Sequence, residues 1–107
     1  LCIFQPHTYS RTKMLFDEFK KAFDNIDELF VIVTDIYASL REEPDESISG
    51  AKLAQAISLE RTNVHYLPSL DDVIQYINEK KYRSDTIIVT MGAGDVYRIS
   101  EELRIKN

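Results

Sequence analysis

The chain has 107 residues, of which 44% are hydrophobic and 29% charged, a composition typical of a soluble globular protein with one core. Its 13 basic and 18 acidic residues give a net charge of −5, which argues against a nucleic-acid-binding face, and no apolar run is long enough to cross a bilayer. Cys2 is the only cysteine, so neither an internal disulfide nor Cys/His metal spacing is present, and a reducing, cytoplasmic setting is expected.

Apolar periodicity predicts alternating strands and helices along the first half of the chain. Residues 1–5 form a buried strand in this interpretation, and a helix follows from about Arg11 to Asn25. The run 29–34 is continuously apolar and β-branched, as in a central parallel strand. Residues 35–49 are polar and are expected to form a loop.

The second half of the chain continues the same alternation. The predicted elements are a helix over 50–58, a strand over 63–66, a helix opened by the Ser69–Asp72 capping box, a buried strand over 86–90, and a last helix after MGAG. Four alternations predict an α/β, Rossmann-like, doubly wound domain with a mainly parallel sheet and helices on both faces. We expect a single domain over 1–107, at whose carboxyl-terminal strand ends a ligand would bind.

The first unusual strand end is FQPHTYSRT, residues 4–12. Thr8 or Ser10 can cap the following helix, which explains one hydroxyl. Arg11 falls in the first helical turn, where the helix dipole disfavours a cation, and a bound carboxylate or phosphate would remove this conflict. An anion site and a simple cap therefore both stay open, and His7 is a structural donor, a base or a ligand contact.

The second unusual strand end is TDIYAS, where Asp35 ends a strand and Tyr37 follows two positions later. A loop as long as the one behind it is often functional, so both residues are candidates. The charged run at 41–43 is expected to be solvated.

The third unusual strand end is TMGAGDVYRI, where Gly92 and Gly94 lie between a strand and a helix. A dinucleotide fingerprint is rejected because Tyr97 occupies the place of its third glycine. Asp95 is a candidate N-cap whose charge disfavours a phosphate there. The glycines are expected to make room for a bulky ligand or a neighbouring domain.

Taken together and in this order, the three stretches resemble the C-terminal domain of the Mur ligase family. FQPHTYSRT is similar to the family's FQPHRYSRT-type motif, TDIYAS to its DVY-A segment, and MGAGDV to its GAGD/N motif. The tripeptide ISG at 48–50 also fits, and the resemblance covers essentially the whole chain.

The resemblance implies an ATP-dependent carbon–nitrogen ligase of bacterial peptidoglycan precursor synthesis. It implies that ATP phosphorylates the carboxylate of UDP-N-acetylmuramate, that Mg²⁺ bridges the phosphates, and that L-alanine attacks the acyl phosphate. The C-terminal domain would close over a central ATP-binding domain, which would hold most of the ATP and Mg²⁺, and would help to hold the amino acid. No metal ligand is expected in this chain. The implied substrate-binding residues are His7, Tyr9, Ser10, Arg11, Asp35, Tyr37, Gly92, Gly94 and Asp95, with His7 and Arg11 as the catalytic candidates.

Two departures from the family pattern bear on this implied activity. The family often has Arg where this chain has Thr8, so one expected positive charge is absent. The glycine-rich phosphate loop and the DDYAHHP-type segment are also absent. We therefore expect the 107 residues to be most of one domain of a three-domain enzyme, associated with N-terminal and central domains and inactive alone.

Two other classes of function stay open. One is a receiver-type signalling module phosphorylated at Asp35, although receivers carry an acidic pair after their first strand where this chain has Gln5, Pro6 and His7. The other is a non-catalytic binding domain that retains the fold without its partner domains.

Overall fold

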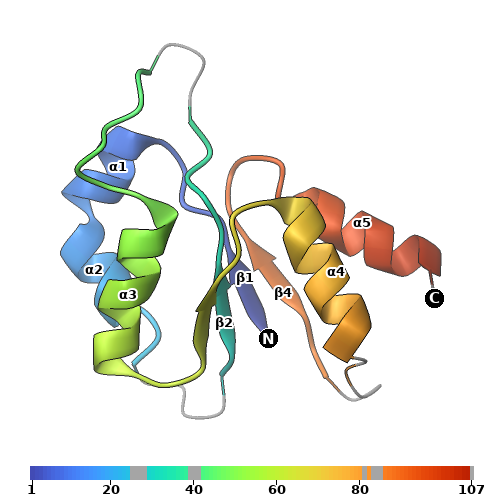
Figure 1. Ribbon diagram of the computed structural model, residues 1–107. Helices are drawn as coiled ribbons and strands as arrows, with labels where there is room; N and C mark the ends of the chain where they lie inside the picture. Colours follow the sequence, from blue (N-terminus) through green and yellow to red (C-terminus); the bar gives the residue numbers. More distant parts are fainter. Residues whose placement is uncertain (25–28, 39–41, 81, 83–85, 107) are drawn as a thin grey trace.

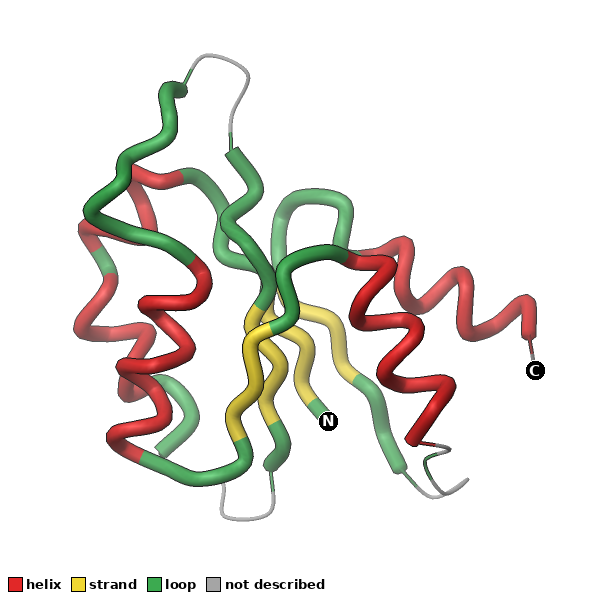
Figure 2. Tube along the Cα trace, viewed as in Figure 1, coloured by secondary structure: helices red, strands yellow, loops and turns green. Residues whose placement is uncertain are grey.

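The computed structural model describes residues 1–24, 29–38, 42–80, 82 and 86–106 of the chain. Its centre is a four-stranded sheet in the order β3-β2-β1-β4, in which all neighbouring strands are parallel (Figure 2). The strands are β1 (Cys2–Phe4), β2 (Val31–Val33), β3 (Val64–Tyr66) and β4 (Val89–Met91). The helices are α1 (Tyr9–Met14), α2 (Phe16–Lys21), α3 (Gly50–Glu60), α4 (Leu70–Lys80) and α5 (Tyr97–Lys106).

Helices cover both faces of the sheet, as the alternating pattern predicts. In Figure 1, α1, α2 and α3 lie to one side of the strands, and α4 and α5 lie to the other. Strand residues alternate between the two faces, so each face contributes to its own buried cluster. One cluster holds Cys2, Phe4, Phe23, Val31, Val33, Leu53, Ala54 and Ile57; the other holds Ile3, Ile32, Val73, Ile77, Val96 and Ile99. This confirms the predicted α/β doubly wound fold.

The two serine caps confirm the predicted starts of the third and fourth helices. Ser49 Oγ accepts a hydrogen bond from the Lys52 N–H at 3.0 Å, and α3 begins at the next residue. Ser69 Oγ accepts from the Asp72 N–H at 3.1 Å at the start of α4. Each hydroxyl satisfies a backbone donor that has no partner within its own helix.

The predicted helix over 11–25 is wrong in its extent and continuity. Helix α1 begins earlier, at Tyr9, and the backbone departs from helical geometry at Leu15, with φ −104° and ψ 17°. Helix α2 then ends at Lys21, and residues 25–28 lie outside the described part of the chain. The apolar spacing continues across this bend. Such spacing shows which side chains face the core, but it does not show whether the helix axis changes direction.

The predicted buried strand over 86–90 is also wrong in part. The strand is displaced to Val89–Met91, and Val89 is 47% and Met91 43% exposed on one of its faces. Ile87, two residues before Val89, is 76% exposed. A continuous apolar run is typical of a strand covered on both faces, but it does not show which part of the protein provides the cover.

None of the helices in the described part of the chain has the length and hydropathy that a membrane span requires.

Candidate functional site at the carboxyl edge of the sheet

Gln5 ties the end of β1 to the glycine-rich turn after β4. Its side chain is 5% exposed; Nε2 donates to Asp95 Oδ1 at 2.8 Å and Oε1 accepts from the Val96 N–H at 3.2 Å. The chain adds β2 and β3 on one side of β1 and then places β4 on the other side. Gln5 therefore lies at the reversal of strand order, where open α/β sheets bind their ligands.

Tyr37 joins all three of the unusual strand ends. Its ring stacks on His7 with centroids 5.7 Å apart and planes inclined by 17°. On Gly94, an added Cβ would lie 2.5 Å from Tyr37 Cγ and 2.7 Å from Gln5 Oε1. Gly94 thus makes room for side chains of its own domain, which corrects the expectation that the glycines make room for a ligand or a neighbouring domain.

Thr8 is the residue that caps α1. Its hydroxyl accepts from the Arg11 N–H at 3.2 Å, and its own N–H donates to the Tyr37 carbonyl at 2.8 Å. Its φ of 62° lies in a region that β-branched residues rarely adopt. Such backbone strain concentrates at functional sites, where surrounding contacts hold it in place. Arginine could not supply this capping hydroxyl.

Glu42 provides the anion at the start of α1. Its carboxylate accepts from the Tyr9 N–H at 2.7 Å and from the Ser10 N–H at 2.9 Å. The expectation that the run 41–43 is solvated is therefore wrong for Glu42, while Arg41 lies outside the described residues. The N-terminus of α1, where Arg11 lies in the first turn, thus already carries a carboxylate of the same chain bound to its free N–H groups.

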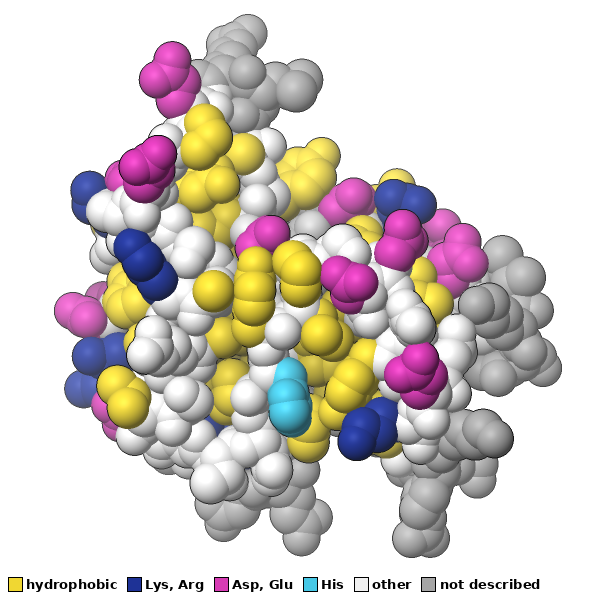
Figure 3. Space-filling model, in the orientation of Figure 1, with side chains coloured by type: hydrophobic (Ala, Val, Ile, Leu, Met, Phe, Trp, Pro, Cys, Tyr) yellow, Lys and Arg dark blue, Asp and Glu magenta, His cyan; other side chains and the backbone are white. Residues whose placement is uncertain are grey.

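A cleft of about 310 Å³ opens at the carboxyl edge between the ends of the strands. Acidic side chains gather on this part of the surface, in the upper half of Figure 3. Its charged lining consists of three carboxylates and one guanidinium among the described residues, so its charge favours a cationic or zwitterionic ligand. The lining is Gln5, Thr34, Asp35, Ile36, Tyr37, Pro68, Ser69, Leu70, Asp71, Asp95 and Arg98.

Two of the cleft carboxylates have partners that hold them in place. Asp35 Oδ1 accepts a hydrogen bond from the Tyr66 hydroxyl. Burial, followed by this bond, raises the pKa of Tyr66 to about 12, so the phenol stays a donor at neutral pH. Asp95 holds Gln5 with one oxygen, and Arg98 Nη1 approaches its other oxygen at 3.8 Å.

The structure brings most of the candidate residues to this edge, but in different roles. The residues that line the cleft itself are Asp35, Tyr37 and Asp95. Those that contact this lining or the Glu42 carboxylate are His7, Tyr9, Ser10 and Gly94. Gly92 packs on Gln5, where a Cβ would lie 2.9 Å from the Gln5 carbonyl oxygen. Arg11 is exposed and does not line the cleft.

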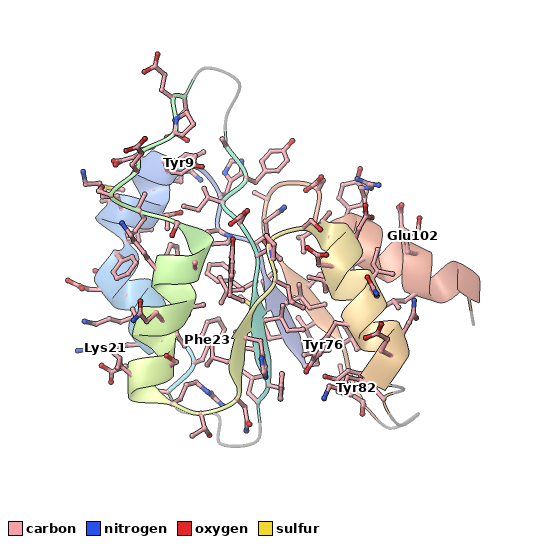
Figure 4. The ribbon with its side chains drawn as sticks, viewed as in Figure 1. Tyr9, Lys21, Phe23, Tyr76, Tyr82 and Glu102 are labelled. Atoms are coloured by element: carbon pink, nitrogen blue, oxygen red, sulfur yellow. The ribbon has the colours of Figure 1, made fainter. Side chains whose placement is uncertain are left out.

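The imidazole ring of His7 has a buried nitrogen atom whose hydrogen-bonding capacity is not satisfied in the described part of the structure. Its Nδ1 is buried and has no hydrogen-bond partner among the described residues. Figure 4 labels Tyr9, two positions later, at the start of α1 and at the same edge of the sheet. The geometry leaves the three roles of His7 open, because an unpartnered ring nitrogen is compatible with a donor, a base or a ligand contact.

Sequence reasoning missed several residues of this site. Gln5 lies inside the FQPH motif. Its contacts with Asp95 and Val96 follow from the pairing of β1 with β4, which the sequence does not reveal. Arg98 follows Asp95 by three positions, the spacing of a helical ion pair, and this signal could have been used. Glu42 and Tyr66 reach the site from a loop and a neighbouring strand, so no local pattern marks them.

A second hollow, of about 610 Å³, runs between α4 and α5. It shares Leu70, Asp71 and Arg98 with the cleft but lies along the helices and not at the strand ends. Glu102, labelled on α5 in Figure 4, borders it. The strand-end cleft is the better candidate because it gathers the three motif stretches.

Within the described residues, no group of three or more His, Cys, Asp or Glu side chains is arranged to hold a metal ion.

Comparison with known proteins agrees with the resemblance in the sequence. A family model described as "Mur ligase, glutamate ligase domain" matches residues 1–94. The chain is 46% identical over 99 residues to a UDP-N-acetylmuramate–L-alanine ligase of Acetivibrio thermocellus, covering 92% of this chain and 20% of that protein. It is 44% identical over 100 residues to the ligase of the same name from Clostridium acetobutylicum, and the match covers 94% of this chain and 21% of that protein. It is 41% identical over 102 residues to the ligase of the same name from Brachyspira hyodysenteriae, and the match covers 95% of this chain and 21% of that protein.

The chain thus spans about a fifth of the length of these curated relatives. The matched region includes FQPHTYSRT, TDIYAS and the MGAG turn, the stretches that meet at Tyr37 and Gln5. The chain belongs to the Mur ligase family, and it corresponds to the C-terminal domain of those enzymes.

Proposed function

We propose that the chain is the C-terminal, amino-acid-binding domain of a ligase that joins L-alanine to UDP-N-acetylmuramate with ATP. The names of its relatives and the family match support this assignment. The family match favours it over a receiver module or a non-catalytic binding domain.

The observation that carries the proposal is the chemistry of the strand-end cleft. L-Alanine is a small zwitterion, and the cleft combines the carboxylates of Asp35 and Asp95 with the guanidinium of Arg98. Charge-assisted hydrogen bonds to the ammonium group would hold the amino acid in register at this edge. After the ammonium group has lost a proton, the amine attacks the acyl carbon of the acyl phosphate and phosphate leaves; holding the amine in place lowers the entropic part of this barrier.

Arg11 has a separate role in this proposal. It is exposed at the same edge of the sheet, so it can meet negative charge presented by a substrate that another domain holds. Neutralising that charge as it develops is the main protein contribution to phosphoryl and acyl-phosphate chemistry. Bound ATP and Mg²⁺ would supply carboxylate activation, and we assign them mainly to a central domain outside this chain.

The experiment that tests the proposal uses the full-length ligase containing this chain. With ATP and UDP-N-acetylmuramate present, we expect phosphate release to depend on L-alanine and mass spectrometry to detect the amide product. The 107-residue chain alone should release no phosphate. Phosphate release that is independent of any amino acid, or ligation by the isolated chain, would contradict the proposal.

A further inference from the structure

The strand-end cleft and the hollow between α4 and α5 meet at three shared residues. The cleft has a volume of about 310 Å³ and the hollow a volume of about 610 Å³. Both are lined by Leu70, Asp71 and Arg98, which lie at the starts of α4 and α5, two helices that are next to each other in Figure 1. A space larger than the cleft itself therefore lies on the far side of these three side chains.

The wall of the cleft that the sheet provides is tightly packed. Gln5, Thr34 and Ile36 are all buried. Gln5 is held by its two hydrogen bonds to the segment after β4, and Thr34 Oγ1 donates to the Asp35 carbonyl at 3.1 Å. A ligand that extends past these side chains would have to displace part of the core, where packing leaves little free volume. A larger ligand therefore finds space on the side of the cleft that faces α4.

Leu70 is the apolar member of the three shared residues, and its neighbours hold it in place. It is half-buried and packs against the cluster that includes Val73 and Val96. Asp71 and Arg98 are exposed, and exposed charged side chains change rotamer rapidly, whereas a packed side chain moves only if its neighbours move as well. Of the three shared side chains, Leu70 thus forms the wall between the cleft and the hollow.

The backbone just before Leu70 is tied to the end of β2. The Leu67 N–H donates to the Val33 carbonyl at 3.0 Å, and the Asp35 N–H donates to the Pro68 carbonyl at 3.2 Å. These two bonds fix the start of α4 relative to Asp35, the carboxylate to which the proposed function assigns the ammonium group of the amino acid. The distance between this carboxylate and the Leu70 wall is therefore set by the fold.

Beyond Leu70 lies apolar surface that a longer aliphatic side chain could contact. Ile74 follows Leu70 by four positions, on the same side of α4, and it lines the hollow but not the cleft. If the charged lining of the cleft holds the ammonium and carboxylate groups, the side chain is the part that differs between one amino acid and another. Without the Leu70 side chain, the cleft would open toward Ile74.

We propose that Leu70 sets the upper limit on the size of the amino-acid side chain that the ligase accepts, and that it excludes branched aliphatic amino acids such as L-valine. This proposal rests on the proposed function, in which the cleft holds L-alanine. One methylene more or less in an apolar pocket changes kcat/KM by about 10–200-fold. L-Valine has two more carbon atoms than L-alanine, so a fixed wall at this place is sufficient to reject it.

Leu70→Ala in the full-length ligase tests this role. We expect the ratio of kcat/KM for L-valine to kcat/KM for L-alanine to rise at least about tenfold over the wild-type ratio. A general loss of folded enzyme lowers both values equally and leaves the ratio unchanged. Ile74→Ala is the matched control, because it shortens an aliphatic side chain of the same helix that does not line the cleft, and it should change the ratio by less than about twofold. An unchanged ratio in Leu70→Ala, or an equal rise in Ile74→Ala, would overturn the proposal.

A second variant covers the case in which Leu70→Ala does not fold. Leu70→Val shortens the side chain by one carbon atom, so we expect the kcat/KM ratio of L-2-aminobutyrate to L-alanine to rise at least about threefold. No rise in this ratio would overturn the proposal as well. The wild-type enzyme distinguishes this inference from the proposed function. Phosphate release that does not depend on L-alanine would contradict the proposed function, whereas alanine-dependent release with unchanged ratios in the Leu70 variants would contradict the role of Leu70 alone.

Discussion

At the scale of single residues, Arg11 is the side chain whose interpretation changes most. The sequence places it against the helix dipole and thereby points to an anion. In the structure the start of this helix carries a carboxylate of the same chain, that of Glu42, which accepts hydrogen bonds from the Tyr9 and Ser10 N–H groups. The residue types and their spacing reveal the conflict between Arg11 and the helix dipole, but they leave an anion site and a simple cap both open. They could not reveal that the anion comes from a loop more than thirty positions away along the chain.

Arg11→Ala in the full-length ligase tests whether this cation faces substrate. We expect the KM for L-alanine to rise, or kcat to fall, by about tenfold or more, the loss typical of one charge-assisted contact. Lys13→Ala is the matched control, because it removes a cation from the same helix whose partner is Asp45 at 3.3 Å. Wild-type kinetics in Arg11→Ala would remove Arg11 from the site.

The alkaline titration of Tyr66 tests the hydrogen bond to Asp35. Burial and this bond raise the pKa of Tyr66 to about 12 from an ordinary value of 10.0. The neutral phenol is the favoured form, so its stabilising contribution is complete below about pH 10 and is lost as the pH rises toward 12. We expect the tyrosinate absorbance change near pH 12 to be smaller in Tyr66→Phe; an unchanged amplitude there would count against the bond. Burial also raises the pKa of Tyr82 to about 12, so Tyr82→Phe serves as a reference for the amplitude of one residue.

At the scale of secondary-structure elements, the order and type of the helices and strands could be predicted, whereas their ends and some of their faces could not. Ser49 and Ser69 mark helix starts because a hydroxyl cap acts on donors only two or three positions away. The bend at Leu15 and the open face of β4 depend on what packs from a distance. Periodicity detects the apolar residues at 87, 89 and 91 but not their exposure in the described part of the structure.

Gly94→Ala tests the packing that joins the glycine turn to Tyr37. The added methyl would lie 2.5 Å from Tyr37 Cγ, and the neighbouring Gln5 is itself buried, so relief requires movement of the turn. We expect the free energy of unfolding to fall by about 1–3 kcal/mol, as for other overpacked sites. Urea denaturation measures this change. Ala93→Ser, at an exposed neighbouring position, should change it by less than about 0.5 kcal/mol. Equal stability of the two variants would show that the turn does not pack as described.

Glu42→Ala tests the contact between the loop and the start of α1. It removes a carboxylate that accepts two backbone N–H groups, so we expect a loss of about 1–2 kcal/mol in the free energy of unfolding. Glu43→Ala changes an exposed neighbour of the same type and should have little effect. If both substitutions are equally neutral, the Glu42 contact does not stabilise the domain.

At the scale of the whole molecule, the four parallel strands bring three separated sequence motifs to one edge. Strands in common register end together, so FQPHTYSRT, TDIYAS and MGAGD meet although up to ninety positions separate them. The sequence therefore predicts the edge and most of its residues. It does not predict that Asp71 and Arg98 line the cleft, because these residues lie on α4 and α5, which reach the strand ends only through tertiary packing.

The KM for L-alanine in Asp35→Asn, measured in the full-length ligase, tests most directly whether this edge holds the amino acid. Asp17→Asn is the control, because it removes a carboxylate that is 85% exposed on α2 and does not line the cleft. We predict that Asp35→Asn raises the KM for L-alanine by at least about tenfold, with the KM for ATP changed by less than about twofold, while Asp17→Asn leaves both unchanged. An unchanged KM for L-alanine in Asp35→Asn would contradict the assignment of the cleft to the amino acid.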